Sequence, residues 1–268
     1  MVLAVEFLKN DYASHQYRKY NDVVLRGYKV SEAARNQPKS GQLLCWIATH
    51  QKNHNCKVQA VYKTWLKRCD SYHILTDRLP PFYLSLFWKT HLALYYIYTY
   101  ISKDFDWKYL STLNPSKPYY LGYRLKLKAP KNGYNSGSAY VLSKEAMRIY
   151  AEKLFSNHSL CPFHIWEDLG LARCLAKFSI YPTDTRDSEG RQRFFAFRPT
   201  DHLTGNLWKE AIFDEVDEAS KNIFHENVVS FHHLTADEII MMELGYQQRE
   251  NEYGGKNKNI TKVVSNYA

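Results

Sequence analysis

The amino-acid sequence predicts an α/β fold of the Rossmann type, with a mixed sheet flanked by helices. The first observation is a continuous apolar run, Leu43–Thr49, which has the length and composition of a strand buried on both faces. The second is the apolar spacing of a short helix over Val58–Trp65, followed by a strand-like segment, Tyr72–Thr76. A strand, a helix and a strand in this order are typical of nucleotide-binding sheets. No Gly-x-Gly-x-x-Gly motif follows the first strand, which disfavours a dinucleotide cofactor.

Later segments continue the alternation of strands and helices. Trp88–Ile101 combines helical apolar spacing with many β-forming residues, and we expect a helix because the run is long for a strand. A turn rich in Gly and Ser precedes an apolar strand, Ala139–Leu142, after which Ser143 is expected to cap a helix with Glu145 in its first turn. The remaining predicted elements are the strands Tyr119–Lys128 and Val228–His232 and the helix Ala236–Leu244.

Composition narrows the classes of function. A chain of 268 residues with 45% hydrophobic and 15% aromatic residues suits one large α/β domain. The net charge is +9, but Lys and Arg are scattered, so we expect no nucleic-acid partner. The charge fits either a cleft for a nucleotide diphosphate or an ordinary solvated surface. No segment reaches the ~18 apolar residues that span a bilayer, and residues 1–10 are too few for a signal sequence.

Cysteines and sequons bear on the compartment. None of the 5 cysteines falls into Cys-x-x-Cys spacing, which disfavours a zinc site, and their odd number leaves at least one thiol unpaired. The residues alone leave open whether the others form disulfides or remain buried thiols in a reducing compartment. Asn157 and Asn259 each begin a sequon for N-glycosylation, which weakly favours a secretory address.

The most informative segments are GYNSGSAYVLSKEA, residues 133–146, and WEDLG, residues 166–170. In this order they resemble the acceptor-binding half of the core 1 β1,3-galactosyltransferases (glycoprotein-N-acetylgalactosamine 3-β-galactosyltransferases), inverting GT-A enzymes of the Fringe-like group. The resemblance extends over residues 42–245. It implies a GT-A-like domain with a nucleotide half at 42–130 and an acceptor half at 131–245. Residues 1–41 are then expected to be a polar leader and linker, and residues 246–268 a disordered tail.

The resemblance implies the transfer of galactose from UDP-galactose to the 3-hydroxyl of GalNAc on Ser or Thr, the step that extends mucin-type O-glycans. On the donor side, Thr49 would face the crevice that holds uridine diphosphate. Lys89 would be a counter-charge for the diphosphate, and Trp88 would cover the base or ribose. On the residues alone, a core tryptophan beside a solvated lysine explains this pair equally well.

The acidic pair Glu167-Asp168 is the candidate for the chemical step. In an inverting transfer the acceptor hydroxyl loses its proton as it attacks the anomeric carbon, and a carboxylate at the acceptor site can take that proton. The resemblance makes Asp168 the base and Glu167 its neighbour, and it places Tyr134, Gly137 and Trp166 at the acceptor. Without the resemblance, an acidic pair at a helix start more often stabilises the helix dipole.

The resemblance also implies a disulfide between Cys161 and Cys174, which would bracket the acidic pair and contribute roughly 3 kcal/mol. Cys45 and Cys69 would likewise pair and leave Cys56 odd. The resemblance implies a place in the Golgi lumen or membrane. Members of the family carry an N-terminal membrane anchor, which we do not expect in this sequence, so we expect a soluble domain. The expected partners are UDP-galactose and glycoproteins that carry GalNAc, and the family allows a homodimer.

The metal site is where the sequence departs from the family. Family members hold Mn²⁺ with a histidine of a Phe-His pair, here His232, and with an Asp-x-Asp cluster at the end of a central strand. Strand alternation would place only one of His232 and His233 on the cleft side.

The central strand and its acidic cluster are missing, because Asp106 is followed almost directly by the segment that comes after them in the family. Asp104 and Asp106 fit the Asp-x-Asp pattern by letter, but their upstream neighbours match the family's preceding helix, so we expect a chance match. The alternative function is therefore a catalytically impaired or non-catalytic relative that binds glycopeptides or a partner protein.

Overall fold

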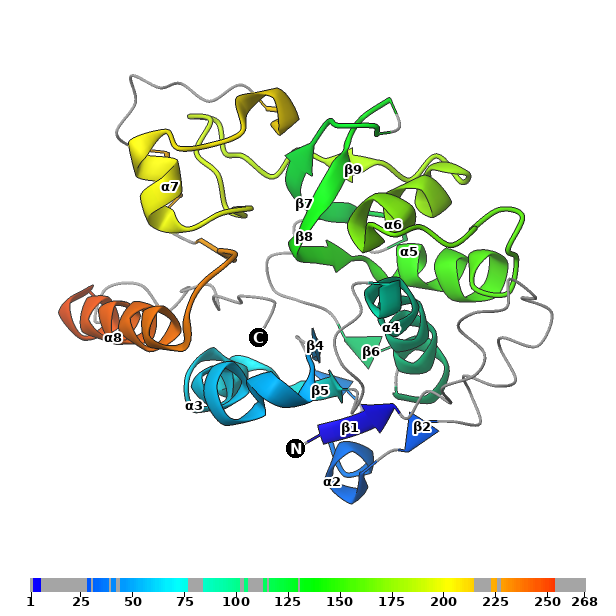
Figure 1. Ribbon diagram of the computed structural model, residues 1–268, viewed down its shortest axis with the longest axis horizontal. Coiled ribbons are helices and arrows are strands. Elements are labelled where there is room, and N and C mark those ends of the chain that lie inside the picture. The colour runs from blue at the N-terminus through cyan, green and yellow to red at the C-terminus, as the bar shows by residue number, and fades with distance from the viewer. Residues whose placement is uncertain are drawn as a thin grey trace.

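Strands and helices of the computed structural model form a mixed α/β architecture of small sheets flanked by helices (Figure 1). The structure describes residues 2–5, 28–29, 31–38, 40–41, 44–76, 84–101, 104–105, 113–114, 116–129, 131–214, 223–225 and 228–253. Their buried apolar side chains form a hydrophobic cluster shared by the sheets and by the helices between them. The α/β class predicted from the sequence is confirmed.

The larger sheet has the strand order β2-β1-β5-β4. Parallel pairing joins β4 to β5, in a register that runs from Leu44 opposite Ser71 to Ala48 opposite Leu75. The two apolar runs of the sequence therefore share one sheet, as predicted. The strands are β1 (Val2–Val5), β2 (Tyr28–Lys29), β4 (Leu44–Ala48) and β5 (Ser71–Thr76).

Part of the expected leader belongs to this sheet. The apolar segment Val2–Val5 forms β1, which pairs in parallel with β5, because a short apolar strand can use the free edge that β5 offers. α2 (Glu32–Arg35) follows with Ser31 as its N-cap. β3 (Ser40–Gly41) and β6 (Asp104–Phe105) make a separate parallel pair, so a short strand lies just before the point where the sequence lacks the family's central strand.

Between β4 and β5 the chain is helical from Gln51 to Arg68, interrupted at Thr64. The regular part, α3 (Gln59–Lys63), lies within the predicted helix Val58–Trp65. A disulfide joins Cys45 of β4 to Cys69, just before β5, and ties this helical crossover to the sheet.

A buried helix lies between the two main sheets. α4 (Leu84–Tyr96) continues as one π-helical turn over Ile97–Ile101, which confirms the predicted helix and extends its start. Every side chain from Phe87 to Leu94 is buried. A helix buried on all sides needs partners on all sides, and Figure 1 shows α4 between β4 and β5 on one side and α6 on the other.

The second sheet has the order β8-β7-β9 and lies mostly in the part of the chain expected to be the acceptor half. β7 (Tyr120–Leu125) and β8 (Tyr134–Leu142) form an antiparallel hairpin, and β9 (Pro182–Thr183) pairs in parallel with β7. β8 starts earlier than the predicted strand Ala139–Leu142. Gly133, with φ of +80°, provides the left-handed turn residue before β8.

Two helices pack beside the hairpin. Ser143 caps α5 (Lys144–Ile149), and its Oγ accepts a hydrogen bond from the amide of Ala146, as predicted. α6 (Glu167–Ala176) lies along β8. Gly170 allows α6 to approach α4, since a Cβ at this position would lie 2.6 Å from a ring carbon of Phe87.

The C-terminal part departs from the predictions. In place of the predicted strand Val228–His232 there is a single bridge between Ser230 and Phe194, and His233, with φ of +61°, ends the extended run. α7 (Pro199–Thr204) precedes this region, and α8 (Ala236–Tyr253) follows it. α8 packs against α3 and extends into the segment expected to be a disordered tail. Among the described residues, no helix has the length and apolarity needed to cross a membrane.

Candidate functional site

The head of α6 brings together most of the predicted acceptor residues. Trp166 is the N-cap, and Glu167 and Asp168 form the acidic first turn. The helix lies against β8, which contributes Tyr134 and Gly137. Tyr134 is buried in the sheet, and Gly137 faces the acidic turn through its backbone.

The Asp168 carboxylate is held by two backbone amides. Its Oδ2 accepts a hydrogen bond from the amide of Gly137 at 3.0 Å, and its Oδ1 accepts one from Leu169 at 2.8 Å. Burial raises the pKa of Asp168 above its ordinary value, and the two amide bonds oppose that rise. Each oxygen retains a second lone pair, so the carboxylate can accept a further hydrogen bond from a bound hydroxyl. A positioned carboxylate of raised basicity suits proton abstraction.

Glu167 has a different environment. Its side chain is only 2% exposed, and its Oε1 accepts a hydrogen bond at 2.8 Å from the hydroxyl of Tyr140 on β8. The negative charge of Glu167 helps to raise the pKa of Tyr120 and of Tyr150, although burial is the main cause in both. Glu167 therefore lies among tyrosines inside the protein, whereas Asp168 is partly exposed.

Trp166 forms the exposed rim of this site. The residue is 37% exposed, and the ammonium of Lys128 lies 5.0 Å from the ring centroid. The Nδ1 atom of His164 lies 3.0 Å from the amide of Trp166, whose hydrogen bond it accepts. Lys128, His164 and Tyr140 were not predicted from the sequence. The Gly/Ser-rich start of β8 was the local signal that pointed to this region, but it names none of these three residues.

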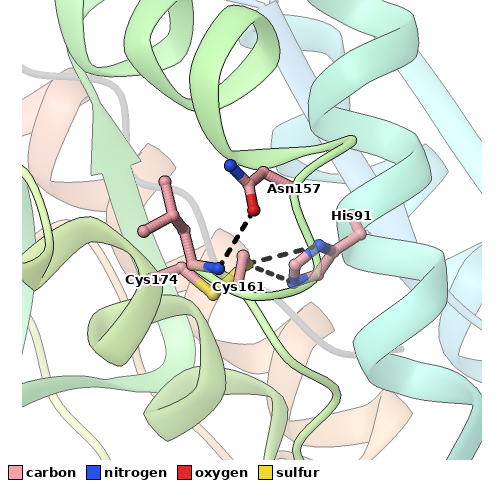
Figure 2. Close-up of a disulfide and its surroundings, with 5 residues drawn as sticks. His91, Asn157, Cys161 and Cys174 are labelled. Atoms are coloured by element: carbon pink, nitrogen blue, oxygen red, sulfur yellow. Dashed lines mark hydrogen bonds between the residues drawn. A yellow bond between two sulfur atoms is a disulfide. The ribbon is translucent and has the colours of Figure 1, made fainter.

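A disulfide fixes the segment that leads into α6. Cys161 and Cys174 are bonded, as the resemblance implied, and both are buried. Figure 2 shows the ring of His91, on α4, against this disulfide, with the Cys161 sulfur 3.9 Å from Nε2. Burial lowers the pKa of His91 to about 3, so the imidazole is neutral there. Cys45–Cys69 is also bonded, and Cys56 is free and exposed, which excludes the alternative of five buried thiols.

The two predicted glycosylation sites fare differently. Asn157 lies just before the disulfide, and its Oδ1 accepts hydrogen bonds from Ser159 Oγ at 2.8 Å and from the amide of Leu160 at 3.2 Å (Figure 2 shows the second). The Asn157 side chain is partly exposed. Asn259 lies outside the described residues.

The donor-side candidates meet at the carboxyl ends of β4 and β5. Thr49 follows β4, and its buried Oγ1 has no hydrogen-bond partner within the described part of the chain. The ammonium of Lys89, only 5% exposed, donates to the Thr49 carbonyl at 3.0 Å. At the end of β5, Thr76 Oγ1 lies 2.6 Å from Nε2 of His54. Ligands of parallel sheets bind outside the carboxyl ends of the strands, which is where this cluster lies.

Trp88 lies in an aromatic cluster inside the protein. Its ring stacks on Phe163 at a centroid distance of 5.5 Å and meets Phe87 edge to face at 5.1 Å. Only 6% of Trp88 is exposed. In this structure the ring joins α4 to the segment before α6.

His232 does not belong to a strand, although one was predicted there. Its ring stacks on the ring of His233, with the two centroids 3.9 Å apart. The two side chains therefore lie side by side, and the strand alternation expected for them is wrong because His233 adopts a left-handed backbone. Burial, and next the neighbouring His233, lower the pKa of His232 to about 3, so its imidazole is neutral. Lys57, from the helical crossover, contributes to the same shift.

The described residues do not assemble a Mn²⁺ site around His232. Within the described ranges, the single cluster of three potential ligands is His91, Cys161 and Cys174, and its two sulfurs are bonded to each other. Mn²⁺ prefers oxygen ligands, so this cluster does not suit it. Asp104 is in β6, and Asp106 lies outside the described residues.

Comparison with known proteins supports a relationship to β1,3-galactosyltransferases. The chain is 26% identical to glycoprotein-N-acetylgalactosamine 3-beta-galactosyltransferase 1 of Xenopus laevis over 256 residues. The matched region covers 79% of this chain and 70% of that protein. No family model matches the chain.

Proposed function

We propose that this protein is a core 1 type β1,3-galactosyltransferase, which transfers galactose from UDP-galactose to the 3-hydroxyl of GalNAc on Ser or Thr with inversion. The observation that carries the proposal is the Asp168 carboxylate, which two backbone amides orient and burial makes more basic. The similarity to a galactosyltransferase of this kind supports a nucleotide-sugar donor and a glycoprotein acceptor.

Asp168 is the general base of the proposed reaction. The acceptor hydroxyl donates a hydrogen bond to the carboxylate and transfers its proton there as its oxygen attacks the anomeric carbon. The new carbon–oxygen bond forms on the face opposite the diphosphate, and the bond to the diphosphate oxygen breaks, which inverts the anomeric centre. Glu167 is buried and accepts a hydrogen bond from the Tyr140 hydroxyl. Its proposed part is therefore to hold the first turn of α6 rather than to take the proton of the acceptor hydroxyl.

The donor is proposed to bind at the ends of β4 and β5. The Lys89 ammonium lies beside the Thr49 carbonyl, and a buried cation there favours a diphosphate nearby. Trp88 packs away in the aromatic cluster, so its proposed contribution is to shape the wall of the crevice rather than to cover the base.

His232 is proposed as a ligand of Mn²⁺, an ion that would neutralise the charge of the leaving diphosphate. A neutral imidazole is the form that binds metals, and the lowered pKa of His232 keeps it neutral. The test is UDP binding with Mn²⁺ and after chelation: His232→Ala should weaken only the Mn²⁺-dependent part.

A secretory compartment is the proposed location. Two disulfides are typical of oxidising compartments, and Asn157 presents a partly exposed sequon. With the similarity to a glycosyltransferase, these features support the Golgi lumen.

The proposed function is tested by incubating the full chain, made in a secretory host, with UDP-galactose, Mn²⁺ and a peptide that carries one GalNAc. The expected product has galactose β1,3-linked to that GalNAc, as determined by NMR. UDP binding without any transfer would contradict the enzyme and leave the second candidate, a non-catalytic glycopeptide-binding relative. That candidate is favoured by one observation: within the described residues, no carboxylate joins His232 in a cluster of three ligands.

A further inference from the structure

The loop between β7 and β8 carries a concentration of positive charge. Residues 126–133, here named the basic loop, contain Lys126, Lys128 and Lys131, all exposed, and no acidic residue. Arg173 of α6, also exposed, contacts this loop. Within the described part of the chain, none of these four cations forms an ion pair with a carboxylate. Their charge therefore remains available to a ligand.

The basic loop is anchored to the head of α6. Arg173 Nη2 donates a hydrogen bond to the Lys128 carbonyl at 3.0 Å, and the Lys128 ammonium lies over the Trp166 ring. Lys128 has φ of +53°, a backbone conformation that lysine rarely adopts. Such a conformation persists where the surroundings impose it, and here the imposed geometry directs Lys128 toward Trp166.

The nearby acidic groups are engaged elsewhere. Glu167 is buried and accepts a hydrogen bond from the Tyr140 hydroxyl, and Asp168 accepts hydrogen bonds from the backbone amides of Gly137 and Leu169. Trp166 precedes Asp168 by two residues, so the Cα atoms of the residue whose ring Lys128 covers and of the proposed base are at most about 7 Å apart. The positive charge thus lies at the rim of the acceptor position without being neutralised from within.

We infer that the basic loop selects acceptors whose peptide carries Asp or Glu within about three residues of the glycosylated Ser or Thr. An extended peptide spans about 10 Å over three residues, and the Lys128 ammonium lies 5.0 Å from the ring of Trp166, two residues before the base. This inference rests on the proposed function, because it requires the acceptor sugar to lie at Asp168. Exposed charge pairs are individually weak, so two or three of them should give roughly a three- to tenfold preference, reduced by salt.

The test compares two fluorescent peptides of equal length, each with one GalNAc. One has Asp and Glu around the glycosylated Thr, and the other has Asn and Gln at the same positions. Dissociation constants are measured by anisotropy with the full chain at low and high NaCl. The variants are Lys128→Gln with Lys131→Gln, and the matched control is Lys177→Gln, an exposed lysine at the opposite end of α6.

The expected result is that the acidic peptide binds several-fold tighter, that salt removes the difference, and that the double variant removes it while the control keeps it. Equal affinities, or a preference that the double variant retains, would overturn the inference. A melting curve of each variant shows that it is folded. Equal transfer of galactose to both peptides would contradict the acidic preference and leave the proposed enzyme function standing. Preferential binding of the acidic peptide without any transfer would contradict the enzyme function and leave the acidic preference standing. The same two peptides are also measured without GalNAc. An equal preference for the acidic one would also overturn the inference, because the sugar would then not position the peptide along the basic loop.

Discussion

Replacing Tyr140 by phenylalanine removes the hydrogen bond that its hydroxyl donates to the buried Glu167 carboxylate. Oε1 of Glu167 accepts the Tyr140 hydroxyl at 2.8 Å, and Glu167 is only 2% exposed. The phenyl ring preserves the edge-to-face contacts of Tyr140 with Tyr120 at 5.7 Å and with Trp46 at 6.4 Å. The variant therefore removes an O–H donor and leaves the packing unchanged.

The expected loss is about 2 kcal/mol in the free energy of unfolding, because hydrogen bonds to charged groups contribute roughly 1.5–3 kcal/mol. Urea unfolding followed by tryptophan fluorescence measures the change. The midpoint should fall while the slope stays the same, since the surface exposed on unfolding hardly changes.

The matched control is Tyr150→Phe. Tyr150 is fully buried, whereas Tyr140 is partly buried, and within the described residues the Tyr150 hydroxyl has no hydrogen-bond partner. Removing an unbonded buried hydroxyl should change the free energy of unfolding by less than about 0.5 kcal/mol, or stabilise the protein slightly. Equal losses in the two variants would refute the assignment of Tyr140 as the support of Glu167.

Three further predictions follow from buried groups. Replacing both Cys161 and Cys174 by alanine should lower the free energy of unfolding by about 3 kcal/mol, as expected for a sequence separation of 13. Peptide mapping of the unaltered chain without reductant should recover the bridge between these two cysteines, and free thiols at both would contradict it. Gly170→Ala should cost about 1–3 kcal/mol, because its Cβ would lie 2.6 Å from a ring carbon of α4, and an unchanged melting midpoint would show that α6 can move away freely. Burial lowers the pKa of His73 and of His202 to about 4, so the unfolded chain binds protons that the folded chain does not. Stability from these two groups is complete above their ordinary pKa of 6.5 and is lost as the pH falls toward 4, by up to about 3 kcal/mol each; acid titration of the melting midpoint checks this, and a flat profile over that range would contradict it.

Local patterns predicted much of the fold. Leu43–Thr49 is an apolar run and Tyr72–Thr76 is a strand-like segment, and the two predicted strands pair as β4 and β5. Ser143 caps its helix because a hydroxyl before an apolar helical pattern satisfies free amides within a few residues. Signals of this kind act over short distances, so the sequence contains them directly.

The residues that the sequence did not reveal depend on contacts between distant segments. Tyr140 meets Glu167 only because β8 lies along α6, and Lys128 covers Trp166 only because the hairpin loop turns toward that helix. The predicted strand around His232 failed for a related reason: its neighbour offers a single bridge, and residue 233 turns into a left-handed conformation. Hydrophobic periodicity cannot report either effect.

The most direct test of the proposed function is the comparison of Asp168→Asn with the unaltered chain. Asparagine can accept the amide of Gly137 through its Oδ1 but cannot take a proton from the acceptor hydroxyl. Galactose transfer to a GalNAc-peptide should fall by at least about a hundredfold, as expected for the loss of a general base, while the dissociation constant for UDP with Mn²⁺ stays within about twofold. Transfer at the original rate by Asp168→Asn would contradict the assignment of Asp168 as the base.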